Sequence, residues 1–169
     1  MTVDELRASQ APVKTLYKAD PAAASRTLSA EGTLLGENLM CRVATANGPA
    51  DAGLHQAAGG QVPSVCSGDM LLQSLVACAG VTLQAVAAAM SIPVRYGKVR
   101  AEGDLDFRGT LGVSKEVAVG FTSIRLFFEL DSDATAEQLA TLGKLTERYC
   151  VIYQTLKVPP AVSCAVVRH

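Results

Sequence analysis

The amino-acid sequence predicts an α+β fold in which antiparallel sheets pack on a long central apolar helix. Two observations carry this prediction. Runs that alternate apolar and polar residues, as half-buried antiparallel strands do, lie on both sides of an uncharged stretch from residue 70 to residue 90. A second segment with helical spacing follows the later strands, so strands and helices come in groups, as in α+β proteins.

Length and composition bound the class of the protein. A chain of 169 residues can form one domain with a sizeable core. Its 15 basic and 16 acidic residues give a formal charge of −1, so we expect no nucleic-acid partner. The first residues have neither a basic region nor an apolar run, which argues against a secretory signal. Five cysteines without C-x-x-C spacing favour a reducing, cytoplasmic location.

The first part of the chain predicts an arm followed by a hairpin. Residues 1–24 are polar and rich in alanine, and we interpret them as a loosely packed arm that precedes a single domain over 25–169. Alternation from Thr27 to Leu34 predicts a strand. A turn at 36–38 would return the chain into a second strand that continues to Val43.

A long loop and a long helix follow the hairpin. Residues 47–67 are rich in Gly, Ala and Pro and include His55, and a loop of this length is uncommon unless it shapes a site or moves. Ser67 is a suitable N-cap for the next helix, and Asp69 falls in its first turn, where the helix dipole favours a negative charge. The helix is predicted to run to about Met90.

This helix is long enough to cross a bilayer, which gives an alternative interpretation. Its apolar residues are largely alanine, it contains Gln73 and Gln84, and it lacks Trp or Tyr at its ends. A helix that is apolar on all sides also occurs in the core of a soluble protein. We therefore expect no membrane partner.

The second half of the chain predicts two more strands, two helical segments and a last strand. Apolar residues alternate with charged ones over 98–107, and over 124–130 they alternate with Arg125, Phe127 and Glu129; a connection at 108–120 lies between the two strands. Thr135 begins a capping box for a helix that continues into a short helix carrying Cys150. Alternation over 162–166 predicts a final strand.

The cysteines are the side chains that could carry chemistry. Cys78 lies in the middle of the long helix, where a free cysteine is usually an inert core residue. Burial alone raises the pKa of a thiol, so a reactive Cys78 needs an activating cation brought by tertiary structure. Cys150 follows Glu147 and Arg148, so one side of its turn should approach solvent or a cleft. We interpret Cys41 and Cys164 as core residues on strands and Cys66 as a loop cysteine, and we expect no metal site and no cofactor.

Two stretches resemble the OsmC/Ohr family, whose names refer to osmotic induction and organic hydroperoxide resistance. Ser67-Gly-Asp-Met-Leu-Leu-Gln-Ser-Leu-Val-Ala-Cys-Ala-Gly-Val-Thr-Leu is similar to the long central helix of the family, with an acid before Leu-Leu and a cysteine after small residues. Leu145-Thr-Glu-Arg-Tyr-Cys-Val-Ile-Tyr-Gln-Thr-Leu resembles the family's second-cysteine helix. The order of elements and the separation of the cysteines agree over most of residues 25–168.

The resemblance implies an OsmC-like fold, an intertwined homodimer and a two-cysteine hydroperoxide reductase. Cys78 would match the peroxidatic thiolate, which attacks an organic hydroperoxide and becomes a sulfenic acid. Cys150 would match the resolving thiol, which forms a disulfide that an external dithiol reduces.

The chain departs from the family at the groups that activate the cysteine, which places it in a divergent OsmC-like branch. The family uses an arginine with an acidic partner. Asp69 matches the acid position of one branch, but nine residues before Cys78 is a half-turn offset in an ideal helix. The Gly-Arg-Asp-Gly hairpin of the other branch is missing, and Arg26, Arg42 and Arg148 are the candidates for the arginine.

Two other functions remain open for the same scaffold. The missing arginine motif favours a non-catalytic module that binds an apolar small molecule near Cys78. A thiol redox sensor would form the Cys78–Cys150 disulfide without turnover.

Overall fold

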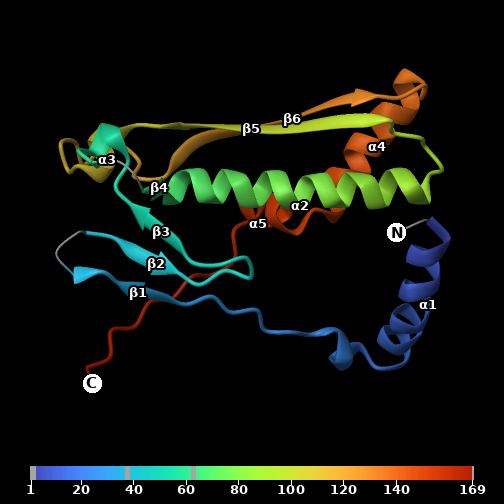
Figure 1. Ribbon diagram of the computed structural model, residues 1–169, viewed down its shortest axis with the longest axis horizontal. Helices are drawn as coiled ribbons and strands as arrows, with labels where there is room; N and C mark the ends of the chain where they lie inside the picture. The colour runs from blue at the N-terminus through green and yellow to red at the C-terminus, as the bar shows by residue number, and fades with distance from the viewer. Residues whose placement is uncertain (1–2, 37–38, 62–63, 169) are drawn as a thin grey trace. The chain divides into compact units, whose positions relative to one another are not determined.

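A computed structural model describes residues 3–36, 39–61 and 64–168 of the chain. Its contacts divide the chain into two compact units, residues 1–67 and 68–169, and each is described by itself. The first unit contains a helix and a small sheet, and the second contains a long helix, a hairpin and two further helices (Figure 1). The chain is therefore α+β, as the sequence predicts.

The first unit begins with α1 (Val3–Ala19), which has no buried residues, followed by the 3₁₀ turn η1 (Pro21–Ala24). Most of the described residues interpreted as a loose arm are thus helical, although none of them is buried. Asp4 and Glu5 in the first turn and Lys18 in the last turn complement the helix dipole, which favours a helix even without a core face. A domain boundary at residue 24 stays a prediction.

A four-stranded sheet with the order β1-β2-β3-β4 forms the rest of the first unit. The predicted hairpin is confirmed, since β1 (Gly32–Leu34) pairs antiparallel with β2 (Cys41–Val43), with Thr33 opposite Arg42. Its first strand is shorter than predicted, because residues 27–31 lie outside the ladder. The predicted turn falls partly on residues 37–38, which lie outside the described part of the chain.

The segment predicted as a long loop contributes two strands to this sheet, which corrects that prediction. β3 (Ala50–Gly53) pairs antiparallel with β2, and β4 (Val65–Cys66) pairs parallel with β3. Between them, η3 (Gln56–Ala58) is capped by the side chain of His55, whose Nδ1 accepts the Ala57 N–H at 3.0 Å. Ala-Asp-Ala-Gly has no β-branched residue, so pairing with β2 and not local propensity makes β3 a strand.

The second unit is built on α2 (Ser67–Ala89), the predicted long helix. Its buried residues recur at helical spacing and form one face, which carries the core of the unit: Leu75, Ala79, Leu83, Val86 and Ala87. Ser91 follows the helix with a left-handed φ of +56°, and the N–H of Ile92 bonds the carbonyl of Ala87 at 2.9 Å. This arrangement satisfies a carbonyl at the helix end and packs Ile92 against the core.

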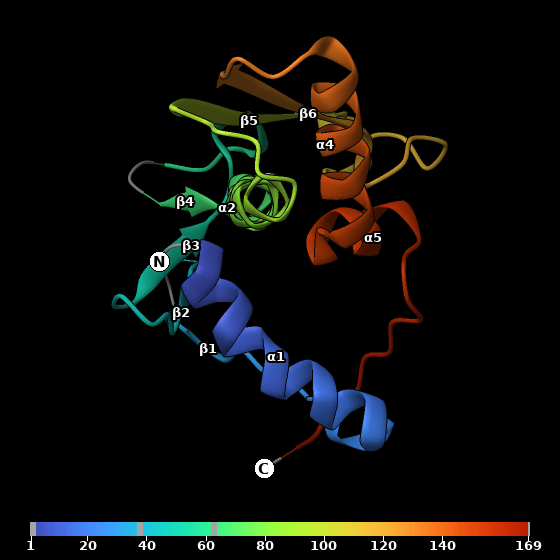
Figure 2. The ribbon, with the colours of Figure 1, turned by 90° about the vertical axis from the view of Figure 1, so that its right-hand side faces the viewer.

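The long hairpin of β5 (Tyr96–Leu105) and β6 (Phe121–Asp131) covers the core face of α2, as Figure 2 shows with α2 seen end-on. Both predicted strands are confirmed, and Val99 lies opposite Phe128 in the antiparallel register. Phe107 belongs to the short helix α3 (Phe107–Thr110) and not to the strand, because Asp106 caps that helix.

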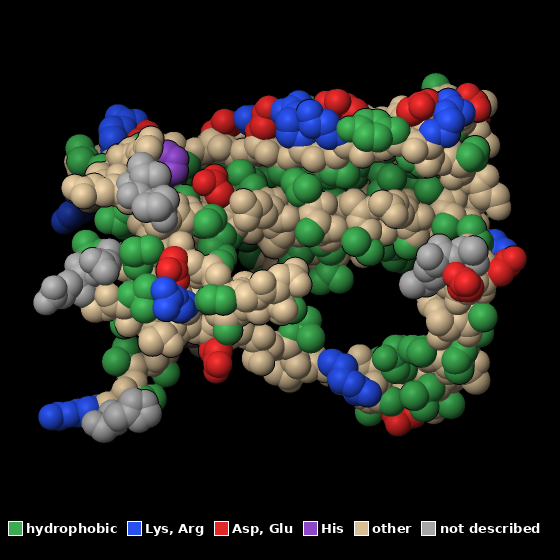
Figure 3. Space-filling model, in the orientation of Figure 1, with side chains coloured by type: hydrophobic (Ala, Val, Ile, Leu, Met, Phe, Trp, Pro, Cys, Tyr) green, Lys and Arg blue, Asp and Glu red, His purple; other side chains and the backbone are tan. Residues whose placement is uncertain are grey.

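The opposite face of this hairpin is charged, and Figure 3 shows basic and acidic side chains gathered along it. Arg125 forms ion pairs with Asp104 and Glu102, and the guanidinium of Arg100 lies 4.2 Å from the ring centre of Phe127. The alternation read from the sequence therefore separates a core face from a solvated face.

Two helices complete the second unit. α4 (Ala136–Tyr149) begins with the predicted capping box, in which Gln138 N–H bonds the Thr135 hydroxyl and Thr135 N–H bonds the Gln138 side chain. α5 (Val151–Lys157) follows after a single residue, Cys150. The predicted final strand over 162–166 is wrong. Residues 158–168 are exposed and irregular, and they pair with none of the strands in the described part of the chain.

Among the described residues, α2 is the one helix long and apolar enough to span a bilayer. This is weak evidence for a membrane span, because the core helix of a soluble protein passes the same test. The buried face of α2 is already covered by the β5–β6 hairpin.

Candidate active site

Cys78 and Cys150 meet inside the second unit. Leu75, Ala79 and Cys150 form a buried cluster, and Cys78 packs against it. The Cys150 side chain is 0% exposed, whereas Cys78 is half-buried. Both thiols are free, so the fold brings together two reduced sulfur groups that are seventy-two positions apart in the sequence.

Cys78 is positioned by α2, whose core face carries Leu75 one turn before it and Ala79 next to it. Because Cys78 lies at the edge of this face, its sulfur points toward the cluster without being fully enclosed. Thr82 follows one turn later on the same side of the helix, at the i,i+4 spacing that makes helical side chains neighbours.

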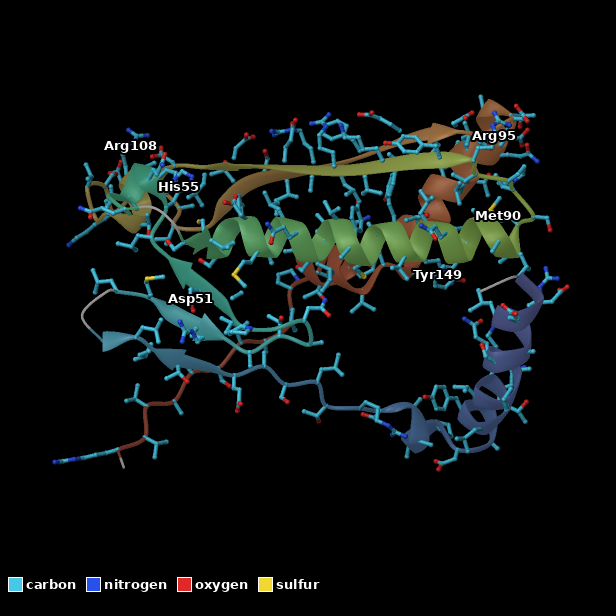
Figure 4. All side chains as sticks on the ribbon, in the orientation of Figure 1. Asp51, His55, Met90, Arg95, Arg108 and Tyr149 are labelled. Carbon is cyan, nitrogen blue, oxygen red and sulfur yellow. The ribbon has the colours of Figure 1, made fainter. Side chains whose placement is uncertain are left out.

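Cys150 is positioned by a break between two helices. Its backbone is extended, with φ −74° and ψ 110°, so it ends α4 and caps the start of α5. The sulfur accepts the N–H of Tyr153 at 3.5 Å. This corrects the prediction that Cys150 lies within a helix: the cysteine is the junction, and the exposed side of this turn is formed by Tyr149 (labelled in Figure 4) and not by the thiol.

The surroundings of the two sulfurs give them opposite acidities. For Cys78, burial is the largest single effect and raises the pKa, but hydrogen bonds from the Ile152 N–H, the Cys150 thiol, the Val151 N–H and the Thr82 hydroxyl together lower it below its ordinary value. For Cys150, burial is again the largest effect and, with the negative charge on Cys78, raises the pKa. Cys78 is thus the sulfur that ionises first as the pH rises.

A cavity of about 590 Å³ adjoins the thiol cluster. Its apolar wall shares Leu75, Ile124 and Leu126 with the side chains that pack around the two cysteines. Tyr153 and Lys157 on α5 add a hydroxyl and an amine, and the Tyr153 hydroxyl bonds the Glu147 carboxylate at 3.1 Å. A space of this size and lining suits a small molecule with an apolar body.

The predicted activating groups lie in different places. Asp69 is exposed in the first turn of α2, and among the described residues it forms no ion pair. The guanidinium of Arg148 lies 5.5 Å from the ring centre of Tyr149. The effects identified at Cys78 within the described part of the second unit are burial and hydrogen bonds, and none comes from an arginine.

The other two candidate arginines belong to the first unit. Arg26 bonds the carbonyl of its neighbour Ser25 at 2.7 Å and is exposed. Arg42 on β2 forms a two-bond pair with Asp51 on β3, at 2.7 and 2.8 Å (Asp51 is labelled in Figure 4). Asp51 was missed in the sequence because its strand was predicted as a loop; the cross-strand register places it opposite Arg42.

The sequence also failed to indicate the hydrogen-bond donors around Cys78. The i+4 spacing of Thr82 was the available signal. The amides of Val151 and Ile152 could not be found in this way, because they depend on the break at Cys150. The prediction that Cys41 and Cys164 are core residues is wrong for Cys164, which is exposed, and overstated for Cys41, which is half-buried.

Among the described residues, no group of three or more His, Cys, Asp or Glu side chains lies close enough to hold a metal ion.

Comparison with solved structures gives several matches to this fold. An OsmC-like protein from Mycoplasma pneumoniae has a TM-score of 0.65 at 16% identity, with 79% of this chain and 91% of that chain covered. An organic hydroperoxide resistance protein from Elizabethkingia anophelis has a TM-score of 0.63 at 14% identity, with 80% and 92% covered. One named organic hydroperoxide resistance protein OsmC, from Legionella pneumophila, has a TM-score of 0.62 at 14% identity, with 79% and 93% covered.

These identities are low, so the structural matches show a shared fold. No curated protein matches the sequence. The model of the family described as OsmC-like protein matches residues 59–165, more than half of the chain and including both α2 and the Cys150 junction. The chain belongs to the OsmC-like protein family.

Proposed function

We propose that the protein is a thiol-dependent peroxidase that reduces organic hydroperoxides, with Cys78 as the peroxidatic and Cys150 as the resolving cysteine. The observation that supports this most directly is the pairing of the two free thiols in one cluster, with the pKa of Cys78 lowered and that of Cys150 raised. Neighbouring structures that are named for organic hydroperoxide resistance support the same role.

The chemistry proceeds in two steps. The Cys78 thiolate attacks the terminal oxygen of R–O–O–H, the O–O bond breaks, and the products are Cys78–SOH and the alkoxide R–O⁻, which takes up a proton. The Cys150 sulfur then attacks the sulfenic sulfur, which forms the Cys78–Cys150 disulfide and releases the hydroxyl as water. An external dithiol restores both thiols by exchange. The peroxide is reduced by two electrons and the thiol pair is oxidised by two.

The apolar cavity beside the cluster suits the organic part of the peroxide. Leu71, Phe121 and Leu156 line it together with the residues shared with the thiol cluster. An apolar wall also limits water around the thiolate, which strengthens the hydrogen bonds that the thiolate accepts.

Of the residues predicted to activate Cys78, Arg42 is the one that has a carboxylate partner in the described part of the chain. Its pair with Asp51 is the kind of arginine–acid pair that the family resemblance implies. We propose Arg42 as the arginine to test first; Arg42→Ala should lower the rate of peroxide turnover, and Arg26→Ala is the matched control from the same unit.

We also propose that the protein is a cytoplasmic homodimer. On the side of α2 away from the hairpin, Val81 is 72% exposed and Ala77 is exposed too, so this helix carries apolar residues that its own unit leaves uncovered. Sedimentation velocity of the purified chain tests this proposal, and a single monomeric species at micromolar concentration would refute it.

The peroxidase proposal is tested by mixing the protein with cumene hydroperoxide and dihydrolipoamide and following the loss of peroxide. Turnover should disappear in Cys78→Ser and should be retained in Cys164→Ser, a matched control because Cys164 is an exposed cysteine outside the cluster. In Cys150→Ser a single equivalent of peroxide should react, without the internal disulfide. Unchanged turnover in Cys78→Ser would refute the assignment.

A binding module is the second candidate, and the apolar cavity is the observation that favours it. Native mass spectrometry of the purified protein would then detect a retained apolar molecule that Leu126→Trp removes. Rapid peroxide turnover by protein without such a molecule would exclude this candidate. A redox sensor differs from both, since it would form the disulfide with one equivalent of peroxide and consume no more in the presence of dithiol.

A further inference from the structure

The cavity beside the thiol cluster has a lysine in its lining, to which the peroxidase proposal gives no role. The cavity lies wholly within the second unit, where α2, the first half of β6 and α5 form its wall. Most of the described lining residues are apolar, and Lys157 in the last turn of α5 is the one with a charged side chain. An ammonium beside an apolar wall indicates a ligand that has an apolar body and a polar end.

The hydroxyl groups in the lining already donate their protons to the protein. Tyr153 donates to a carboxylate of α4 at 3.1 Å, and Thr122 donates to the backbone carbonyl of Asp104, also at 3.1 Å. Ser123 donates to the side chain of Asp104. A hydroxyl has a single proton to donate, whereas an ammonium has three. Among the described side chains of the lining, the donor that remains for a ligand is therefore Lys157.

Lys157 is positioned at the edge of the cavity by a contact with another lining residue. Its Nζ lies 5.9 Å from the ring centre of Tyr153, within the range of a cation–π interaction. The side chain is exposed, as expected where the apolar stem of a lysine follows a wall and the ammonium faces water. In the described part of the chain Lys157 forms no ion pair, so a ligand could reach the ammonium without displacing a carboxylate of the protein.

Two carboxylates lie next to the lining, and protein donors bind both. Asp104 forms an ion pair with Arg125. Glu147 accepts the hydroxyl of Tyr153. Neither carboxylate belongs to the lining itself, so the charge that the described lining presents to a ligand is positive.

We propose that this cavity binds an apolar molecule that carries a single carboxylate, with the acid group at Lys157 and the apolar body along α2 and β6. A carboxylate only accepts hydrogen bonds, so it matches a lining whose remaining side-chain donor is an ammonium. One positive charge is balanced by one negative charge, which favours a carboxylate over a phosphate with its charge of about −2. The inference goes beyond the proposed function, because it requires no reaction at Cys78.

Three probes with the same alkyl chain test this assignment: decanoate, decanol and decylamine. Their head groups are anionic, neutral and cationic at neutral pH. Isothermal titration calorimetry of the reduced full chain, with each probe below the concentration at which it forms micelles, measures the three dissociation constants. Decanoate should bind most tightly and decylamine most weakly. Added sodium chloride should narrow the difference between decanoate and decanol, because salt screens the interaction between exposed charges.

Lys157→Gln should weaken the binding of decanoate about threefold or more and leave that of decanol within about twofold. Lys157 also complements the dipole of α5, and a structural defect from its loss would weaken both probes alike. The ratio of the two dissociation constants therefore separates recognition of the acid from a role in the helix. Lys144→Gln is the matched control, because Lys144 is an exposed lysine of α4 outside the lining, and it should leave both constants unchanged.

The outcomes that would overturn the inference are distinct from a failure of the peroxidase proposal. Absence of decanoate binding, equal constants for decanoate and decanol in the wild-type chain, or an equal loss with both probes in Lys157→Gln would each overturn it. Leu126→Trp places a larger side chain in the wall and should weaken both probes; unchanged binding would put the ligand elsewhere and overturn it too. A chain that binds decanoate but consumes no peroxide would refute the peroxidase proposal and support this inference.

Discussion

The sulfur of Cys150 accepts the backbone N–H of Tyr153 at 3.5 Å, so a cysteine occupies the N-cap of α5. The residue that we propose as resolving thiol therefore also contributes to the start of a helix. Any reaction at this sulfur changes a capping interaction, because a disulfide directs the sulfur toward Cys78. The thiol chemistry and the local stability of α5 are linked through a single atom.

Cys150→Ala should lower the free energy of unfolding more than Cys150→Ser does. Serine keeps an acceptor for the Tyr153 N–H, whereas alanine removes it, and loss of an N-cap acceptor costs about 1 kcal/mol. Urea denaturation followed by circular dichroism measures the difference. If the two variants unfold at the same urea concentration, the sulfur does not stabilise α5.

Alkylation of Cys78 should show a pKa below that of an ordinary thiol. Because the pKa of Cys78 is lowered, its thiolate is present at pH values where a free cysteine is protonated. The alkylation rate should therefore fall only when the pH drops through this lowered pKa. The measurement is the pH dependence of the iodoacetamide rate at Cys78, located by mass spectrometry.

Thr82→Val should raise that pKa, because it removes a hydroxyl that donates to the Cys78 sulfur, and Thr82→Ser should restore it. Arg148→Ala should leave the pKa unchanged, since its guanidinium lies over Tyr149. A large upward shift in Arg148→Ala would mean that an arginine activates the cysteine after all.

Leu142→Ala should destabilise the second unit strongly. Leu142 on α4 is 0% exposed and packs with Leu83 and Val86 of α2, so truncation leaves a cavity that costs about 2–5 kcal/mol. Leu111→Ala is the matched control on an exposed leucine and should change the unfolding free energy by less than about 0.5 kcal/mol. Equal effects of the two substitutions would contradict the packing of α4 on α2.

Ser91→Gly should stabilise the protein by about 1 kcal/mol, because Ser91 holds a left-handed φ of +56° that glycine adopts without strain. Ser74→Gly, in the interior of α2, should have the opposite sign, since glycine lowers the stability of a helix. Thermal unfolding of the pair measures both shifts. A loss of stability in Ser91→Gly would contradict this helix end.

Most elements with strong local signals were predictable from the sequence. The period of two over β5 and β6 and the capping box at Thr135 each involve residues close together in the chain, and these predictions are confirmed. The extent of α2 was predictable for the same reason, since no charged residue follows Asp69 before the helix ends at Ala89.

The elements that depend on distant partners were not predictable. β3 consists of Ala-Asp-Ala-Gly and is a strand because β2 lies beside it. Residues 162–166 have the alternation of a strand but lack a partner in the described part of the chain. Alternation of apolar and polar residues therefore indicates that a segment can have one apolar and one polar face. It does not ensure that the segment pairs with another strand.

The candidate site was predictable only in its two cysteines. Their residue types and helical settings could be read from the sequence, but the contact between them joins segments far apart in the chain. The stretch around Cys150 contains neither glycine nor proline, so nothing in it indicates a break. Without that break, the amides of Val151 and Ile152 would bond within a continuous helix.

The junction at Cys150 also limits which insertions and deletions the chain can accept. Cys150 lies between two separate helices, so the direction of its side chain depends on the residue at which α4 ends and the residue at which α5 begins. One extra residue within α4 would turn everything after it by about 100° about the helix axis and carry the sulfur away from α2. Extra residues after Lys157, beyond both helices, would leave the sulfur where it is, so length variation among relatives should collect there.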